Sequence, residues 1–212
     1  MQSKDLTLEE DQITIRGKTL KIIRPAVLEE VFKGDPFLDL DRFPFWFKIW
    51  ESSLILADYL STIEPPKDIL EIGAGLGVAS LFASSFGHNV VASDYEELPL
   101  ELLERSASEN GLKIQKMKLN WLEPSLNQRF DLIVGAEVIY KRSFYDPLIH
   151  LFQRGLKDSG EVILAHSIDR KRILVPFLHR AESFFHIMTS IRRLKGPEET
   201  SEIVLNRLIP RV

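Results

Sequence analysis

The sequence contains no cysteine among its 212 residues. The chain therefore forms no disulfide, uses no thiolate in catalysis, and lacks the ligand that structural zinc sites most often use. Its five histidines show no metal-ligand spacing. No serine, histidine and aspartate arrangement of a hydrolase is visible either. We therefore expect no metal.

Long apolar runs and an excess of positive charge are also missing. No stretch approaches the run of about 20 apolar residues that a membrane-spanning helix needs. Residues 1–11 are polar and acidic, which is unlike a signal peptide. We therefore expect a cytoplasmic protein with no membrane partner. The formal net charge of −4 argues against a general nucleic-acid binder. We expect the basic clusters 170–172 and 192–193 to be solvated ends of helices or strands.

The chain is long enough for one α/β domain with a modest extension. We expect residues 1–62 to form an N-terminal extension, with a β-hairpin from 12–16 and 19–23 and a tryptophan-containing helix at 48–61. Residues 29–44 are expected to be irregular. We expect residues 63–212 to form the core.

The most informative segment is an apolar strand that runs into an acidic, glycine-rich turn. The strand 68–72 is followed by three glycines in alternation, Gly73, Gly75 and Gly77, and then by a helix pattern. About twenty residues later a second apolar strand ends in Asp94. Such a unit places a nucleoside-bearing ligand across the strand ends, with ribose hydroxyls near the second acid. Asp94 is alternatively a helix N-cap.

The glycine spacing distinguishes between ligands. A dinucleotide fingerprint reads GxGxxG or GxGxxA, but the third position of this chain is Val78. A nicotinamide-dependent oxidoreductase is therefore not expected. The pattern Glu-x-Gly-x-Gly-x-Gly that begins at Glu71 instead resembles motif I of the seven-strand S-adenosylmethionine methyltransferases.

Strand and helix patterns alternate through the rest of the chain. We expect helices at 76–86, 97–109 and 146–157, the last with Asp146 and Pro147 as N-cap and first residue. We expect strands at 89–93, 114–119, 130–134 and 161–165, the last entered through a turn at Gly160. A helix after Asp169 should be kinked or divided by Pro176.

The C-terminal segments 184–194 and 202–210 look like strands joined by a short loop, 195–201. Parallel neighbours need a long crossover, so this pair should be antiparallel. A mostly parallel sheet that ends in an antiparallel hairpin is what the seven-strand methyltransferases show. The predicted fold class is therefore α/β, with a Rossmann-like seven-stranded sheet, helices on both faces and an N-terminal β-hairpin.

Three further segments resemble the protein-lysine methyltransferase branch of that family. Residues 49–60, Ile-Trp-Glu-Ser-Ser-Leu-Ile-Leu-Ala-Asp-Tyr-Leu, resemble the helix before motif I. Residues 119–121, Leu-Asn-Trp, resemble the Leu-Asp-Trp after the third strand, with Asn120 in place of the usual Asp. Residues 130–140, Phe-Asp-Leu-Ile-Val-Gly-Ala-Glu-Val-Ile-Tyr, resemble the fourth strand and its Asp/Glu-x-x-Tyr motif. The resemblance covers roughly residues 12–165 in order.

The resemblance implies S-adenosylmethionine as cofactor and a set of residues around it. The glycines would let the backbone meet the methionine part, and Glu71 would orient the turn or the methionine amino group, unless it is a surface acid. Trp121 and Asn120 would lie at the adenine. The other implied positions are Trp50 over the cofactor or in the core, Tyr95 by the adenine or over the sheet edge, Ala136 beneath the cofactor, and Trp46 in packing or at the substrate rim.

The resemblance also implies a protein substrate that presents a lysine. Glu137 and Tyr140 would hold and polarise its amine, or else cap and pack the next helix. His166, at the end of the strand 161–165, is expected on the ligand side, either supporting the site from behind or as a merely hydrogen-bonded residue. The alternatives left open are a methyltransferase for a small molecule or RNA, and a non-catalytic nucleoside-binding module on the same fold.

Overall fold

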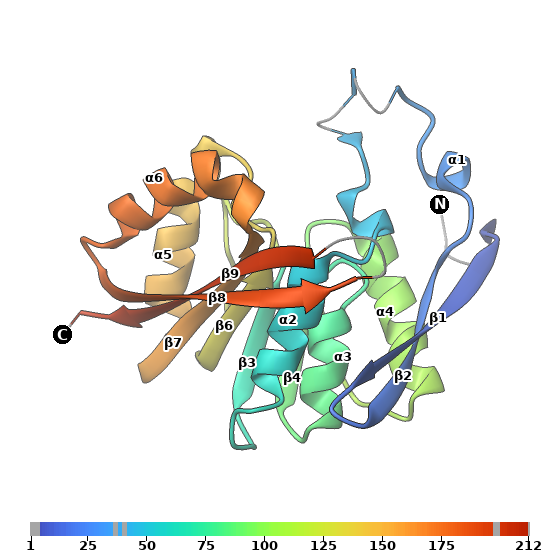
Figure 1. Cartoon of the computed structure of the whole chain (residues 1–212), viewed down its shortest axis with the longest axis horizontal. Coiled ribbons are helices and arrows are strands. Elements are labelled where there is room, and N and C mark those ends of the chain that lie inside the picture. Colours follow the sequence, from blue (N-terminus) through green and yellow to red (C-terminus); the bar gives the residue numbers. More distant parts are fainter. Residues whose placement is uncertain (1–4, 36–37, 40–41, 197–199, 212) are drawn as a thin grey trace.

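The computed structural model describes residues 5–35, 38–39, 42–196 and 200–211. Two segments that were predicted to be irregular are described only in part. Residues 36–37 and 40–41 of the segment 29–44 lie outside the described residues, and so do residues 197–199 of the loop 195–201. Figure 1 shows a central sheet with helices on both of its faces and a separate hairpin near the N-terminus.

The sheet has seven strands in the order β5-β4-β3-β6-β7-β9-β8. The strands are β3 (Asp68–Ile72), β4 (Asn89–Asp94), β5 (Gln115–Lys118), β6 (Phe130–Ala136), β7 (Leu156–Ser167), β8 (Phe185–Lys195) and β9 (Thr200–Pro210). The five strands from β5 to β7 are mutually parallel, whereas β9 runs antiparallel to both β7 and β8. The predicted parallel sheet with a C-terminal antiparallel hairpin is confirmed.

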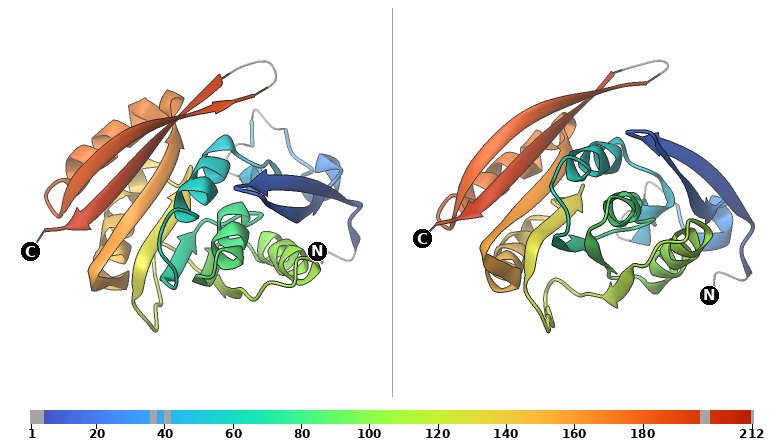
Figure 2. Two further views of the ribbon diagram at one scale, coloured as in Figure 1. Left: turned by 60° about the horizontal axis from the view of Figure 1, so that its bottom comes forward. Right: turned by 90° about the horizontal axis from the view of Figure 1, so that it is seen from below.

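The helices cover the sheet in two layers (Figure 2). One layer contains α2 (Glu51–Leu60), α3 (Val78–Ser85) and α4 (Glu97–Glu109), and the other contains α5 (Tyr145–Gly155) and α6 (Lys171–Ala181). Successive side chains of the buried strand β3 point to opposite faces, so Ile69 joins the first core and Leu70 the second. The same alternation sends Glu71 toward α3.

The predicted N-terminal hairpin is confirmed as β1 (Leu8–Ile15), which begins four residues earlier and ends one residue earlier than predicted, and β2 (Lys18–Pro25), which is longer at both ends. It packs on α4, where the amide of Lys21 donates to Asn110 Oδ1 at 3.0 Å and the amide of Ile23 donates to Ser106 Oγ at 2.9 Å. The connection to α2 contains the short helix α1 (Leu28–Val31) and the 3₁₀ turn η3 (Phe45–Phe47). The division of the chain at residue 62 stays a prediction.

Two local predictions around α5 were wrong. A 3₁₀ turn, η4 (Arg142–Phe144), leads into α5, so Phe144 and not Asp146 is the N-cap, and Asp146 instead binds Arg180. Gly160 is no turn but lies inside β7, where a Cβ would be 2.9 Å from the carbonyl oxygen of Phe130. The helix α6 continues through Pro176, so Pro176 does not divide it, and a kink there stays a prediction.

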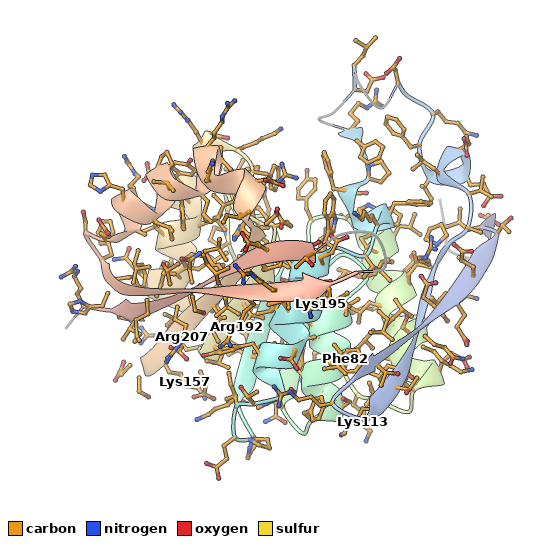
Figure 3. All side chains as sticks on the ribbon, in the orientation of Figure 1. Phe82, Lys113, Lys157, Arg192, Lys195 and Arg207 are labelled. Carbon is orange, nitrogen blue, oxygen red and sulfur yellow. The ribbon has the colours of Figure 1, made fainter. Side chains whose placement is uncertain are left out.

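One lysine links three strands at the N-terminal ends of the parallel strands, which is the end of the sheet away from the strand C-termini. Lys157 Nζ lies 2.7 Å from Asp68 Oδ2 and 3.0 Å from Asp131 Oδ2, and so joins the starts of β3, β6 and β7 (Figure 3). The opposite edge, at the C-terminal ends of the parallel strands, is where open α/β sheets bind their ligands.

Gly77 lies where α3 packs against α4, the two helices nearest the glycine-rich turn. It is the N-cap of α3 and has a φ of 71°, a conformation that disfavours other residues. A Cβ built there would be 2.0 Å from Leu103 Cδ1 on α4. The helices can therefore approach this closely only because residue 77 lacks a side chain.

We expect Gly77→Ala to lower the free energy of unfolding by about 2–4 kcal/mol, because it adds a core clash to an unfavourable backbone. The matched control is Gly111→Ala, where φ is 65° but nothing lies within 4 Å of the new Cβ. That variant should lose only about 1 kcal/mol. Chemical denaturation measures both, and equal losses would mean that Leu103 moves aside without cost.

Candidate functional site

The glycine-rich turn between β3 and α3 lies at the C-terminal ends of the parallel strands. Gly73 and Gly75 have φ values of 59° and 54°. A Cβ at Gly73 would be 3.1 Å from the Trp121 ring, and one at Gly75 would be 3.2 Å from Trp46 Cβ. Only glycine combines this backbone with such close aromatic neighbours, so the turn presents bare backbone toward Trp46 and Trp121.

Glu71 holds the turn from below. Its side chain is buried, and Oε2 accepts hydrogen bonds from the amide of Ser80 at 2.9 Å and from Ser80 Oγ. Burial raises the pKa of Glu71 to about 7, although the Ser80 bonds oppose this shift. The alternative of a surface acid is wrong, and the observed contacts are those of a residue that orients the turn.

Asp94 links the turn to the end of β4. Its Oδ2 accepts from the amide of Gly75 at 2.9 Å, and its Oδ1 accepts from the amide of Glu96 at 3.0 Å. Burial raises the pKa of Asp94, and these backbone bonds oppose it. Since Glu96 is the N-cap of α4, Asp94 is not the helix cap. Each carboxylate oxygen can accept a further bond, which suits two ribose hydroxyls. The neighbouring Tyr95 is exposed.

Two tryptophans lie before α2, Trp46 in η3 and Trp50 at the N-cap position of the helix. The indole N–H of Trp50 donates to the carbonyl of Phe45 at 2.8 Å, and Lys48 lies over its ring. That N–H is therefore used locally, not for a ligand. Trp46 is buried against Gly75, and among the described residues its indole Nε1 has no hydrogen-bond partner. Burial raises the pKa of the nearby Glu96.

Asn120 and Trp121 follow β5 on the other side of the turn. Asn120 Oδ1 accepts from the amide of Leu122 at 3.0 Å and retains a second lone pair. Trp121 belongs to an aromatic cluster with Tyr140 and Phe144, whose ring centroids are 5.3–6.1 Å apart. Our sequence analysis missed Phe144, although its spacing of four residues from Tyr140 was a usable signal.

The chain leaves β6 through a strained residue. Ala136 ends the strand, and Glu137 has a φ of 57°, unusual for a residue other than glycine. Its amide donates to the carbonyl of Ala165 at 2.9 Å, and its Oε1 accepts from the amide of Ser167 at 2.6 Å. These bonds to the end of β7 stabilise the turn that carries Tyr140.

His166 completes this attachment. It is fully buried, and its Nε2 accepts from the amide of Ile139 at 3.0 Å. Burial lowers the pKa of His166 to about 3, so the ring is neutral near pH 7 and can accept this bond. The three bonds of residues 137–139 to residues 165–167 form what we term the β6–β7 clasp.

Glu137 and Tyr140 have different surroundings. Glu137 Oε2 is buried and lies 3.4 Å from Arg170 Nε. Burial raises the pKa of Glu137, opposed by Ser167, Ser52 and Arg170. Tyr140 is 43% exposed, and we term the surface that it shares with Trp121 and Phe144 the mouth of the site. The carboxylate thus faces β7 and Arg170, while the phenol faces the aromatic cluster and solvent.

The described part of the chain contains no group of three histidine, aspartate or glutamate residues placed to hold a metal ion. Within the same residues, no helix is long and apolar enough to cross a membrane.

Comparisons with known proteins agree with this geometry. A family model described as lysine methyltransferase matches residues 46–190. The mouse protein-lysine methyltransferase METTL21E is 30% identical over 132 residues, which are 55% of this chain and 54% of that protein. A histidine protein methyltransferase 1 homolog from Dictyostelium discoideum is 30% identical over 129 residues, or 56% of this chain and 42% of that protein. The chain thus spans about half the length, or less, of these relatives.

A solved structure covers more of the fold. The Thermus thermophilus 16S rRNA N2 G1207 methyltransferase, in complex with AdoMet and guanosine, matches with a TM-score of 0.67. The match covers 96% of this chain and 51% of that one at 19% identity. This likeness shows the shared fold.

The buried Glu71 makes stability depend on pH. Its folded-state pKa of about 7 lies above the ordinary 4.5, so its contribution is fully present below pH 4.5 and is lost as the pH rises through 7. We expect the free energy of unfolding of the wild type, relative to Glu71→Gln, to fall by up to about 3 kcal/mol between pH 4.5 and 8. Denaturant titrations across that range measure it, and parallel pH profiles would contradict it.

Proposed function

Because the chain belongs to the lysine methyltransferase family, we propose that it transfers the methyl group of S-adenosylmethionine to the side-chain amine of a lysine in a protein. One observation carries the proposal. Asp94 binds the amide of Gly75, and the glycine turn so fixed lies against Trp121, whose ring is in turn packed with Tyr140. A nucleoside site and an acceptor mouth therefore share one edge of the sheet.

The residues at this edge fit S-adenosylmethionine. Gly73 and Gly75 expose backbone that its methionine part can meet, Asp94 has acceptor capacity for both ribose hydroxyls, and Trp121 offers a half-buried aromatic face for adenine. Asn120 can accept from the adenine amino group through its remaining lone pair, and Ala136 is small where a larger side chain would crowd the ligand. When bound, the cofactor supplies an electrophilic methyl group on sulfur.

The acceptor side of the site has to orient a lysine amine and exclude water. Tyr140 places its hydroxyl at the mouth, where it can accept a hydrogen bond from the amine. The aromatic cluster beside it restricts water and lines the alkyl part of a lysine with apolar surface. Glu137 sets the direction of the turn through Ser167, and its carboxylate lies against Arg170, three residues before Tyr140 in the chain. A direct catalytic role for Glu137 stays a prediction.

The other functions that the sequence left open, a methyltransferase for a small molecule or RNA and a non-catalytic binding module, are not favoured by the family. The cytoplasmic location also stays a prediction. The decisive test incubates the pure chain with methyl-labelled S-adenosylmethionine and a lysate of its own cells. Acid hydrolysis of the labelled band should yield methyl-lysine. Label in methyl-histidine, in nucleic acid or in no product would overturn the proposal.

We expect Asp94→Asn to weaken binding of S-adenosylmethionine by about ten- to a hundredfold. The variant keeps one acceptor oxygen but loses the charged acceptor for the ribose hydroxyls, which is worth about 1.5–3 kcal/mol. Calorimetry measures the affinity, and NAD, for which we expect no binding, is the control ligand. Unchanged affinity in the variant would leave Asp94 as a structural link between Gly75 and Glu96.

We expect Tyr140→Phe to reduce methyl transfer at least tenfold with little change in cofactor affinity, because only the hydroxyl at the mouth is lost. Glu137→Gln should also reduce transfer more than affinity, since an amide can still accept from Ser167 but carries no charge. The measurement pairs turnover on the labelled protein with calorimetry for each variant. Wild-type turnover in both would assign the two residues structural roles only.

A further inference from the structure

Five basic residues lie in the two chain segments that follow Tyr140 and β7. Lys141 and Arg142 directly follow Tyr140, and Arg170, Lys171 and Arg172 form the turn from η5 (Ile168–Arg170) into α6. Arg170 contacts Glu137, which places the second group beside the first. We term these residues the basic rim.

The rim is open to solvent, as expected of a solvated helix end. Lys141, Arg142, Lys171 and Arg172 are exposed, and Arg170 is half-buried. One acidic side chain of this turn, Asp169, is exposed among them. A chain with a net charge of −4 therefore concentrates cations where its substrate must approach. Like charges gathered at an opening raise the local concentration of an oppositely charged partner.

A surface cleft of about 840 Å³ continues from the rim between α5 and α6. Arg142 belongs to both the rim and the cleft. Farther along, Arg180 forms a two-bond ion pair with Asp146, so this aspartate is already neutralised. Pro176 and the partly exposed Phe184 supply apolar lining. The cleft thus offers a groove with cations at its entrance and apolar surface within.

We propose that the rim and this cleft receive an acidic segment of the protein substrate while its lysine reaches Tyr140. The inference rests on the proposed function. The length of α6 limits how many residues of the acidic segment can lie along the cleft. The 11 residues of α6 span about 16 Å, which an extended peptide covers with about five residues. The target lysine should therefore lie within about five to eight positions of several Asp or Glu residues.

The test measures peptide binding directly. Three fluorescent 15-residue peptides carry a central lysine flanked on both sides by alternating alanine with Glu, Gln or Arg. Fluorescence anisotropy gives their Kd at low salt in the presence of saturating demethylated cofactor. The Glu peptide should bind at least tenfold more tightly than the Gln peptide, and 200 mM salt should reduce the difference. Equal binding of the Glu and Gln peptides would overturn the inference.

The rim variant is Lys171→Glu/Arg172→Glu. Its matched control, Lys113→Glu/Arg154→Glu, makes the same charge change at exposed positions before β5 and near the end of α5. Those positions lie at the opposite edge of the sheet, where Figure 3 labels Lys113. The rim variant should bind the Glu peptide about tenfold more weakly than the wild type. The control should stay within about twofold, and circular dichroism should show both variants folded. Equal weakening of the two would mean a net-charge effect and would contradict a specific surface.

A 20-nucleotide single-stranded RNA serves as the competing ligand. Tighter binding of this RNA than of the Glu peptide, lost in the rim variant, would assign the surface to nucleic acid and overturn the inference. The outcomes also separate the two proposals. Peptide binding as expected, with no methyl-lysine formed from lysate, would reject the function and keep the surface. Methyl-lysine formation without a preference for the Glu peptide would keep the proposed function and reject the acidic-segment surface.

Discussion

The cofactor side of this site depends on a carboxylate that is buried beneath a glycine turn. Glu71 binds the amide and hydroxyl of Ser80, so the end of β3 and the start of α3 cannot separate. Between them the chain turns through Gly73, Gly75 and Gly77, and Asp94 holds the middle of that turn. Glu71 thus fixes the two ends of the loop and Asp94 fixes its centre, and both acidic groups are held away from water. The raised pKa values of both carboxylates reflect that burial.

The acceptor side is held by different means. Residues 137–139 bind the end of β7 through three hydrogen bonds, one of them to the neutral ring of His166. The clasp forces Glu137 into a left-handed backbone conformation and so aims the chain that carries Tyr140. The basic rim continues from the same turn, through Lys141 and Arg142, and from the end of β7, through Arg170, Lys171 and Arg172. The chemistry proposed for the mouth and the charge around it therefore have one structural origin.

The sequence predicted what depends on local periodicity and on backbone rules. The order of strands and helices, the α4 boundaries at 97–109 and the C-terminal hairpin were all readable, because apolar spacing and loop length determine them. Predictions failed where a distant partner decides. Asp146 resembles an N-cap until Arg180 binds it, and Gly160 resembles a turn until the carbonyl groups of β6 approach. Likewise, composition cannot tell which of Trp46 and Trp50 lies against the glycine turn, since only the path from η3 to α2 places them.

The two sides of the site meet at Trp121 and Val138. The Trp121 ring and Val138 Cγ1 both lie 3.1 Å from where a Cβ of Gly73 would stand, and Trp121 also packs with Tyr140 and Phe144. The glycine turn is therefore in contact with residues that shape the acceptor side. A substitution in the aromatic cluster is consequently transmitted to the methyl donor as well as to its recipient, so the two halves of the fold are constrained to diverge together.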